Sequence, residues 1–236
     1  MLRGVVFDMD GVLIDSHPLH RVAWKHFLLT LGRHVSDGDL DFILDGRRRD
    51  EILCYFLGNL THAQISEYGA KKDEMLRQFG EGIQPFHGVV EFLDCLRRSG
   101  IRIAMATSAS RQRAFGTLEE LGVAPYFEVI VTGDEVTSSK PDPAIYRLAA
   151  ARLNESPENL LAVEDSVSGV KSARSAGMWC AGVAPADRAD KLRAAGADPV
   201  ISDFRLLSLE EMKARFRLSQ APKESLARGL SRTSHV

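Results

Sequence analysis

The chain has 236 residues, of which 44% are hydrophobic and 26% are charged, and its formal net charge is -2. This length allows one large domain or two small ones, and the charge balance excludes a bulk basic surplus for nucleic acid or an anionic membrane. No apolar run reaches the roughly 18 residues needed to cross a membrane, and the first is too short for a signal peptide. We therefore expect a cytoplasmic, monomeric protein whose partner is a small molecule.

The first predicted element is a buried strand over residues 3–8, which ends in the sequence Asp8-Met9-Asp10-Gly11. Acids at the carboxyl end of a strand lie where open α/β sheets place their chemistry. Side chains two apart on an extended segment point the same way, so Asp8 and Asp10 can converge on one site while Gly11 relieves crowding at the turn. The motif alone is equally compatible with acids that cap the next helix and face water.

Residues 15–85 contain no strand pattern. Four helical patterns follow one another there, at 17–31, 37–45, 48–58 and 62–80. Because this segment leaves the chain beside the acids and returns near Pro85, we interpret it as a helical cap inserted over the carboxyl ends of the strands. Such a cap can act as a lid.

From residue 87 onward, helical patterns alternate with strand-like runs at 101–107, 127–132, 160–164, 179–183 and 199–202. This alternation is typical of βαβ units, so it predicts an α/β fold with a doubly wound parallel sheet. Helix boundaries are predicted from an N-cap and N1 pair at Asp142-Pro143, and from closing residues at Ser99-Gly100 and Gly177.

We therefore divide the chain into an α/β core (residues 1–14 and 86–215), a helical cap (residues 15–85) and a tail (residues 216–236). The tail has few large apolar residues and carries four basic residues against one acid, which is more typical of a disordered end than of a docking segment. The three cysteines (Cys54, Cys95 and Cys180) fall in apolar periodic segments without C-x-x-C spacing, so we expect reduced core residues.

Three further groups of polar residues lie at the boundaries of predicted core elements. Thr107 and Ser108 end the strand that begins at residue 101, Lys140 precedes a helix start, and Glu164-Asp165 ends the strand at 160–164. An acid pair, a hydroxyl, a lysine and a second acid pair in this order resemble the haloacid dehalogenase superfamily of phosphotransferases. The resemblance covers roughly residues 1 to 210.

The resemblance implies that Asp8 attacks phosphorus and forms an aspartyl phosphate, which water then hydrolyses. Asp10 would protonate the departing oxygen, a role that requires a pKa raised toward working pH by the neighbouring negative charge. This second acid argues for phosphate esters, because a halide leaves without a proton.

A carboxylate cluster with no histidine or cysteine nearby in sequence suits a hard cation, so we expect Mg²⁺. By resemblance, Asp8, the backbone carbonyl of Asp10 and Asp165 would bind it, and Glu164 would ligate directly or through water. The alternative for Glu164 and Asp165 is a structural helix cap.

By the same resemblance, Lys140 would neutralise the acids and hold the phosphoryl oxygens, while Thr107 would donate a hydrogen bond to the phosphate. Ser108 rivals Thr107, because the segment from Thr107 to Ser110 can be aligned in two registers. Ser108 and Ser110 are therefore further candidates for substrate binding.

In the cap, His20, Arg49 and Lys72 lie at positions similar to those that β-phosphoglucomutases use to grip a sugar phosphate. An arginine fork suits a second phosphate group. Each residue also has an ordinary alternative: Arg49 in a solvated charge run, Lys72 among helix-surface charges, and His20 as a structural histidine.

Hydrolysis and phosphoryl mutation share this whole core site, so the sequence separates them poorly. We predict a phosphatase of small phosphorylated sugars or related metabolites, with a β-phosphoglucomutase as the alternative. A phosphoacceptor signalling receiver is a third possibility, but its phosphorylated Asp follows a later strand, and neither 101–108 nor 127–134 offers that layout.

Overall fold

The computed structural model describes residues 1–79 and 83–219. These residues form a six-stranded sheet in the order β3-β2-β1-β4-β5-β6, in which every pair of neighbouring strands is parallel. The strands are β1 (Gly4–Phe7), β2 (Arg102–Ala106), β3 (Val129–Val131), β4 (Leu160–Glu164), β5 (Trp179–Val183) and β6 (Val200–Ile201). From β1 the strands are added outward on both sides, first β2 and β3 on one side and then β4 to β6 on the other, as in doubly wound α/β folds. This topology confirms the predicted fold class.

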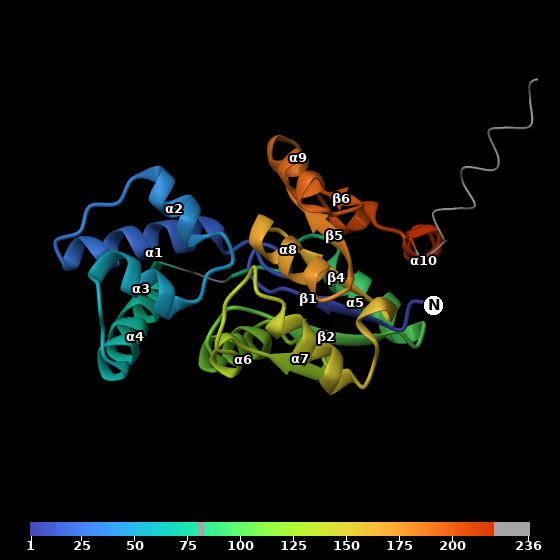
Figure 1. The fold of residues 1–236 in the computed structure, drawn as a ribbon, viewed down its shortest axis with the longest axis horizontal. Helices are drawn as coiled ribbons and strands as arrows, with labels where there is room; N and C mark the ends of the chain where they lie inside the picture. Colours follow the sequence, from blue (N-terminus) through green and yellow to red (C-terminus); the bar gives the residue numbers. More distant parts are fainter. Residues whose placement is uncertain (80–82, 220–236) are drawn as a thin grey trace, which may run out of the picture.

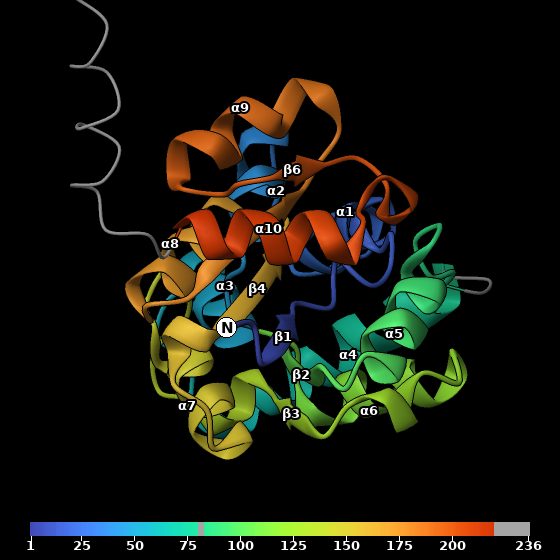
Figure 2. The same cartoon turned by 90° about the vertical axis from the view of Figure 1, so that its right-hand side faces the viewer.

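Helices cover both faces of the sheet because side chains alternate along each strand. Val5 and Phe7 of β1 pack on one face with helices α5, α6 and α10, and Val6 packs on the other with α7, α8 and α9. Figures 1 and 2 show these two layers around the strands. The helices are α5 (Val89–Arg98), α6 (Arg111–Glu120), α7 (Ala144–Leu153), α8 (Val167–Ser175), α9 (Ala186–Ala195) and α10 (Leu209–Ser219).

The predicted helical cap is also present and has a hydrophobic core of its own. It consists of α1 (His17–Thr30), α2 (Asp37–Ile43), α3 (Arg49–Leu57) and α4 (His62–Phe79). Trp24, Phe27 and Leu53 are among its buried side chains. Its two connections to the core lie side by side, since Ile14 and Pro85 form an antiparallel bridge. Figure 1 shows the cap beyond the carboxyl ends of the strands.

Two helix boundaries agree with the predicted closing residues and one start differs by a residue. Helix α5 ends at Arg98, and the glycines after α5 and α8 adopt positive φ angles of 67° and 94°. Helix α7 begins at Ala144, so Pro143 takes the N-cap position. Proline has no amide hydrogen, and the Asp142 carboxylate therefore accepts its hydrogen bond from the backbone N–H of Ala144, at 2.8 Å.

The prediction that all three cysteines lie in the core was wrong for Cys54. Its thiol is exposed on α3, whereas Cys180 is buried in β5 and Cys95 is half-buried. Ile52 and Leu53 occupy the buried side of α3, and the next residue along a helix is rotated about 100° away, which turns Cys54 toward solvent.

The predicted tail begins too early at residue 216. Helix α10 continues to Ser219, and Phe216 is 1% exposed with its ring 5.7 Å from that of Trp179. Met212 and Phe216 are four residues apart, so both face the sheet from one side of the helix. Residues 220–236 of the predicted tail lie outside the described residues.

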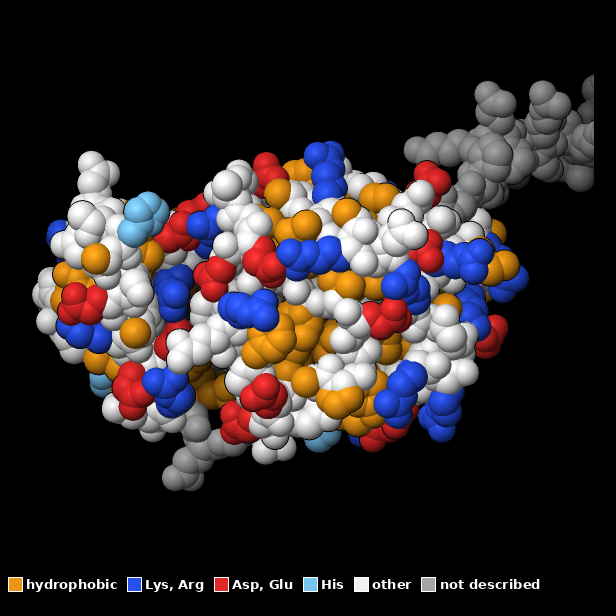
Figure 3. Space-filling view, turned by 90° about the horizontal axis from the view of Figure 1, so that it is seen from below, with side chains coloured by type: hydrophobic (Ala, Val, Ile, Leu, Met, Phe, Trp, Pro, Cys, Tyr) orange, Lys and Arg blue, Asp and Glu red, His pale blue; other side chains and the backbone are white. Residues whose placement is uncertain are grey.

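Charges are mixed on the face of the molecule shown in Figure 3, where lysine and arginine side chains are interspersed with acidic ones. None of the helices within residues 1–79 and 83–219 is both long and apolar enough to span a membrane.

We expect Phe216→Ala to lower the free energy of unfolding by about 3–5 kcal/mol, because it removes a buried ring from the core. Urea denaturation at equilibrium measures this change. Leu218→Ala is the matched control, since Leu218 is on the same helix and 74% exposed. Equal stability of the two variants would contradict the packed position of Phe216.

Candidate active site

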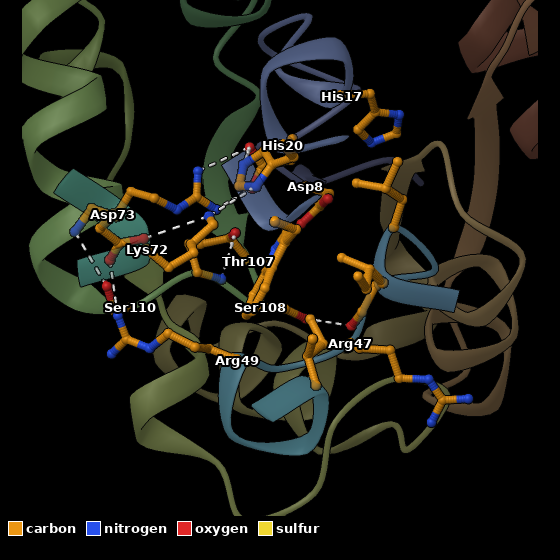
Figure 4. A pocket seen from close by; sticks show the side chains of 18 of the residues that line it. Asp8, His17, His20, Arg47, Arg49, Lys72, Asp73, Thr107, Ser108 and Ser110 are labelled. Atoms are coloured by element: carbon orange, nitrogen blue, oxygen red, sulfur yellow. Dashed lines mark hydrogen bonds and ion pairs between the residues drawn. The ribbon is translucent and has the colours of Figure 1, made fainter. Parts of the chain in front are cut away.

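The carboxyl ends of β1, β2 and β4 meet at a pocket that the cap closes from the other side. Figure 4 shows side chains from both parts facing it. Its lining includes most of the predicted site residues together with two that were not predicted: Asp8, Asp10, His17, His20, Arg49, Lys72, Thr107, Ser108, Ser110, Arg113 and Asp165. The remaining predicted residues, Lys140 and Glu164, are buried and contact Asp8 directly or through each other.

Lys140 joins two of the acids beneath the pocket. Its ammonium Nζ donates hydrogen bonds to Asp8 Oδ1 at 3.0 Å and to Glu164 Oε1 at 2.5 Å, and the side chain is 1% exposed. A third bond goes to the backbone carbonyl of Ala106 at 3.3 Å. The buried ammonium is therefore fully paired, and the negative charges beside it hold its pKa above the ordinary value despite burial, which favours the neutral form.

Glu164 has hydrogen-bond partners at both carboxylate oxygens. Oε1 accepts from Lys140 and from the hydroxyl of Tyr146 at 2.7 Å, and Oε2 accepts from the hydroxyl of Ser166 at 3.1 Å. Gly169 of α8 leaves the space that this carboxylate occupies, since a Cβ there would lie 2.0 Å from it. The side chain is thus fixed in one position.

Asp8, Glu164 and Asp165 form a buried cluster in which one oxygen from each lies within 4.8 Å of the others. Burial raises the pKa of Asp8 to about 7, with the charges of Glu164 and Asp10 adding to the effect and Lys140 opposing it. Burial, reinforced by Glu164 and Asp8, also raises the pKa of Asp165 well above its usual range. One lysine does not neutralise this cluster of three carboxylates. These oxygen donors therefore fit a hard divalent cation.

Asp10 differs from the sequence-based expectation. Its carboxylate accepts two hydrogen bonds from the Arg113 guanidinium, one at 2.9 Å, and a third from the hydroxyl of Ser16 at 2.5 Å. His20 Nε2 lies 3.3 Å from Oδ1. Burial alone would raise the pKa of Asp10, but the charge of Arg113, with a smaller contribution from the neighbouring His20, holds it well below the usual range. The expected raised pKa was wrong, because a cation from α6 outweighs the neighbouring acid.

Sequence reasoning missed Arg113. It lies in the first turn of α6, one residue after Gln112 and two after Arg111, which stacks on Phe115. Because helical patterns alternate with strand-like runs, a helix was expected between 101–107 and 127–132, so an arginine near the strand ends was foreseeable. Which of the two arginines turns inward depends on the path of the loop between β2 and α6, which the pattern does not give.

The three hydroxyls after β2 differ in their partners. Thr107 Oγ1 accepts from the backbone N–H of Ala109 at 3.1 Å. The Ser108 hydroxyl donates to the backbone carbonyl of Gly46 in the cap at 2.7 Å. The Ser110 hydroxyl caps α6, accepting from the N–H of Arg113 at 3.4 Å. Ser108 thus connects the core to the cap, while the Thr107 hydroxyl can direct its hydrogen toward a group in the pocket.

In the cap, His20 and Lys72 form a buried pair. Lys72 Nζ lies 3.0 Å from His20 Nδ1 and 5.3 Å from the centre of the Trp24 ring. Burial, together with the charge of Arg113, lowers the pKa of Lys72 to about 8. Burial and the charge of Lys72 lower the pKa of His20 to about 3. The alternative that placed Lys72 among helix-surface charges was wrong, since Lys72 is 3% exposed.

The three consecutive arginines of the cap, Arg47 to Arg49, have different surroundings: Arg47 and Arg49 line the pocket, whereas Arg48 is largely buried and donates to the backbone carbonyl of Val136 in the core. Arg49 Nη1 pairs with Asp73 at 2.8 Å in the pocket wall, and Lys72 lies 3.5 Å from the same carboxylate. Arg47 also lines the pocket and stacks on Phe42, at 4.7 Å from the ring centre. Arg48 also pairs with Asp50. Arg49 is therefore partly buried and paired, not a free solvated charge.

His17 is the second site residue that the sequence did not reveal. Its Nε2 lies 3.3 Å from Asp165 Oδ2, so the acid cluster does have a histidine beside it. Burial is the largest cause that lowers its pKa. The residue is visible at the start of a predicted helix, but nothing in the sequence brings it next to an acid almost 150 residues later.

Without divalent cations, we expect the unfolding temperature of Asp8→Asn to rise relative to that of the unsubstituted protein as pH increases from 5 to 8. The pKa of Asp8 rises from 3.8 to about 7 on folding, so the folded state binds more protons in this window. The free energy of unfolding therefore falls as pH rises, on the order of 1 kcal/mol per pH unit, and asparagine removes this loss. Thermal unfolding in a chelator measures it. Asp41→Asn, at an exposed carboxylate, is the control, and a pH-independent Asp8→Asn effect would contradict the prediction.

Comparison with known proteins agrees with the four motifs. The family of haloacid dehalogenase-like hydrolases matches residues 2–177. The chain is 37% identical over 179 residues to a phosphorylated carbohydrates phosphatase of Thermotoga maritima, covering 75% of this chain and 82% of that protein. It is 30% identical over 232 residues to a β-phosphoglucomutase of Bacillus subtilis, covering 93% and 99%. The structure of CbbY from Rhodobacter sphaeroides with xylulose-(1,5)bisphosphate superposes with a TM-score of 0.76 at 28% identity, covering 88% and 97%. The predicted resemblance is confirmed, and the chain belongs to the haloacid dehalogenase-like hydrolase family.

Proposed function

We propose that this protein is a Mg²⁺-dependent phosphatase that hydrolyses small phosphate monoesters, such as sugar phosphates, through an aspartyl-phosphate intermediate. The observation that carries the proposal is the position of Asp8, which directly follows β1 and lines the pocket, with Lys140 at one of its oxygens and Asp165 beside it. The phosphatase relative that acts on phosphorylated carbohydrates supports this substrate class.

Asp8 and Asp165 would hold the cation, with the backbone carbonyl of Asp10 as the third protein ligand that the family resemblance implies. Bound Mg²⁺ would offset the negative charge of the acids and of the phosphoryl oxygens. Glu164 is better suited to a supporting role, because both of its oxygens already accept hydrogen bonds from Lys140, Tyr146 and Ser166. This would leave Glu164 to fix Lys140 and the turn into α8.

Asp8 would act as the nucleophile. A carboxylate oxygen of Asp8 forms a bond to phosphorus while the bond between phosphorus and the ester oxygen breaks. Water then attacks the acyl phosphate and releases inorganic phosphate. Lys140 keeps Asp8 oriented and would hold a phosphoryl oxygen in exchange for one of its three present contacts, and Thr107 can donate its hydroxyl hydrogen to another phosphoryl oxygen.

Asp10 would carry the proton to the leaving oxygen and later remove one from the attacking water. In the arrangement described here, Arg113 and Ser16 occupy both of its oxygens. Proton transfer therefore requires Asp10 to give up at least one of these contacts when substrate fills the pocket. Its position two residues after Asp8 keeps it within reach of the same phosphoryl group.

Substrate selection would fall to the cap and to the loop after β2. Arg49, His20 and Lys72 line the pocket from the cap side, and Ser108 and Ser110 line it from the core side. One chain supplies every residue named here, so a monomer acting on a small phosphorylated metabolite suffices. We further propose that it acts in the cytoplasm.

A second candidate, β-phosphoglucomutase activity, is supported by the mutase relative that the chain matches over 99% of that protein's length. Arg49 supports it further, because a guanidinium in the pocket wall is suited to the second phosphate of a bisphosphate. We place it second because the phosphatase relative is more similar to this chain.

The central test is hydrolysis of p-nitrophenyl phosphate and sugar phosphates with and without Mg²⁺. We expect phosphate release only with the cation, and we expect Asp8→Asn to reduce turnover by at least about three orders of magnitude. Phosphate release is measured at saturating substrate, with Asp41→Asn as the control at an exposed carboxylate. Undiminished turnover of Asp8→Asn would reject Asp8 as the nucleophile.

The two candidate reactions are separated with β-glucose 1-phosphate plus a trace of glucose 1,6-bisphosphate. We expect free phosphate to exceed glucose 6-phosphate, and the reverse would favour the mutase. Arg49→Ala should weaken kcat/KM for the bisphosphate at least about tenfold more than for p-nitrophenyl phosphate, because only the bisphosphate has a second group to pair. Arg33→Ala, at an exposed position of the cap, is the control. Equal losses on both substrates would contradict an Arg49 clamp.

A further inference from the structure

We propose that His17 is a positioning residue that orients Asp165 for metal binding, and that through it the affinity for the cation depends on the position of the cap. The inference rests on the proposed function, in that it takes Asp165 to be a metal ligand. It concerns a residue that plays no part in the reaction steps above.

The contact between His17 and Asp165 crosses from the cap to the core. His17 is the first residue of α1, two residues beyond the connection at Asp15, whereas Asp165 directly follows β4 at the centre of the sheet. The connection itself is held by the bridge between Ile14 and Pro85. His17 therefore moves with the cap, and Asp165 stays with the core.

The His17 imidazole is a potential hydrogen-bond donor that lies next to a carboxylate oxygen of Asp165. His17 Nε2 lies 3.3 Å from Asp165 Oδ2, with the two side chains 14% and 3% exposed. That oxygen is buried and has no hydrogen bond of ordinary geometry among the described residues. A slight rotation of the imidazole completes the bond, since 3.3 Å is only just beyond the usual N–H···O range. Figure 4 shows His17 over the pocket that Asp8 also lines.

Gly11 makes this contact possible. It has a positive φ of 75°, and a Cβ at this position would lie 2.3 Å from Asp165 Oδ2 and 2.9 Å from His17 Cε1. The turn after β1 thus passes close to both partners, and only a residue without a side chain leaves room for them to meet. Gly11 therefore allows the turn after β1 and also leaves space for His17 beside Asp165.

The neighbouring residues of α1 face the acids in the same way. The Ser16 hydroxyl bonds Asp10 at 2.5 Å and leaves the helix without a side-chain cap. His20 Nε2 lies 3.3 Å from the same carboxylate. The start of the cap therefore contacts two acids of the core. Ser16 and His20 contact Asp10, and His17 contacts Asp165. Any movement of α1 must change the surroundings of Asp165.

A hydrogen bond to the free oxygen of a ligating carboxylate fixes its orientation, and loss of such a partner typically weakens metal binding by 10–100-fold. A neutral imidazole supplies that bond without adding a positive charge that would compete with the cation. Linkage makes the effect reciprocal, so cation binding must in turn stabilise the cap position that keeps His17 on Asp165.

The test measures Mg²⁺ affinity by calorimetry on the full chain without substrate, with Mn²⁺ binding followed by paramagnetic resonance as a second probe. Two variants of similar bulk are compared: His17→Leu, which cannot donate, and His17→Gln, which can. We expect the dissociation constant to rise about 10–100-fold for His17→Leu and to stay within about threefold for His17→Gln. His26→Ala is the matched control, because His26 is an exposed histidine of the same helix.

Hydrogen exchange tests the link to the cap. Mg²⁺ should slow exchange in a peptide from the start of α1 in the unsubstituted protein and in His17→Gln, but not in His17→Leu. Wild-type affinity in His17→Leu, or equal weakening in both variants, would overturn the positioning role while leaving the proposed function intact. If the unsubstituted protein bound no divalent cation, both proposals would fail, so the two failures are distinguishable.

Discussion

The pairing of Lys140 with Asp8 and Glu164 is the interaction on which the rest of the site depends. Three carboxylates, those of Asp8, Glu164 and Asp165, are buried within a few ångströms of one another, an arrangement that repulsion and desolvation would oppose. The Lys140 ammonium joins two of them, and the loss of a partner from such a buried pair typically costs about 3–5 kcal/mol. Because one cation cannot balance three acids, the folded chain retains a negative site that a divalent ion can complete.

The cap completes the pocket and also contacts the acids of the core. Ser16 and His20 approach Asp10 from the start of α1, and the Ser108 hydroxyl reaches back from the core to the cap at Gly46. Arg113 approaches Asp10 from the core side. The protonation of Asp10 is therefore controlled by groups from both parts of the chain. This explains how a cap that leaves the core beside the acids can influence chemistry as well as exclude water.

Most of the fold could be predicted because its signals are local. Apolar runs and helix caps locate the strands, and acids such as Asp8 and Asp165 at strand ends must meet at one edge of a parallel sheet. The start of the tail was predicted wrongly because Phe216 is an isolated aromatic in the sequence. Its contact with Trp179 exists only in the folded protein, where α10 packs on the core. Arg113 and His17 escaped prediction for the same reason, since their importance comes from partners in the fold more than 100 residues away.

The error over Asp10 shows what the sequence does not contain. Two acids two residues apart imply mutual repulsion, and from repulsion alone a raised pKa follows for both. In the folded protein the cations are distributed unequally: Lys140 is paired with Asp8, where burial still dominates, and Arg113 engages both oxygens of Asp10. The pKa values of Asp8 and Asp10 are thereby shifted in opposite directions. In the proposed reaction, substrate would raise the pKa of Asp10 by taking over contacts that Arg113 now makes. The electrostatics of the pocket are thus suited to a ligand that brings negative charge to Arg113.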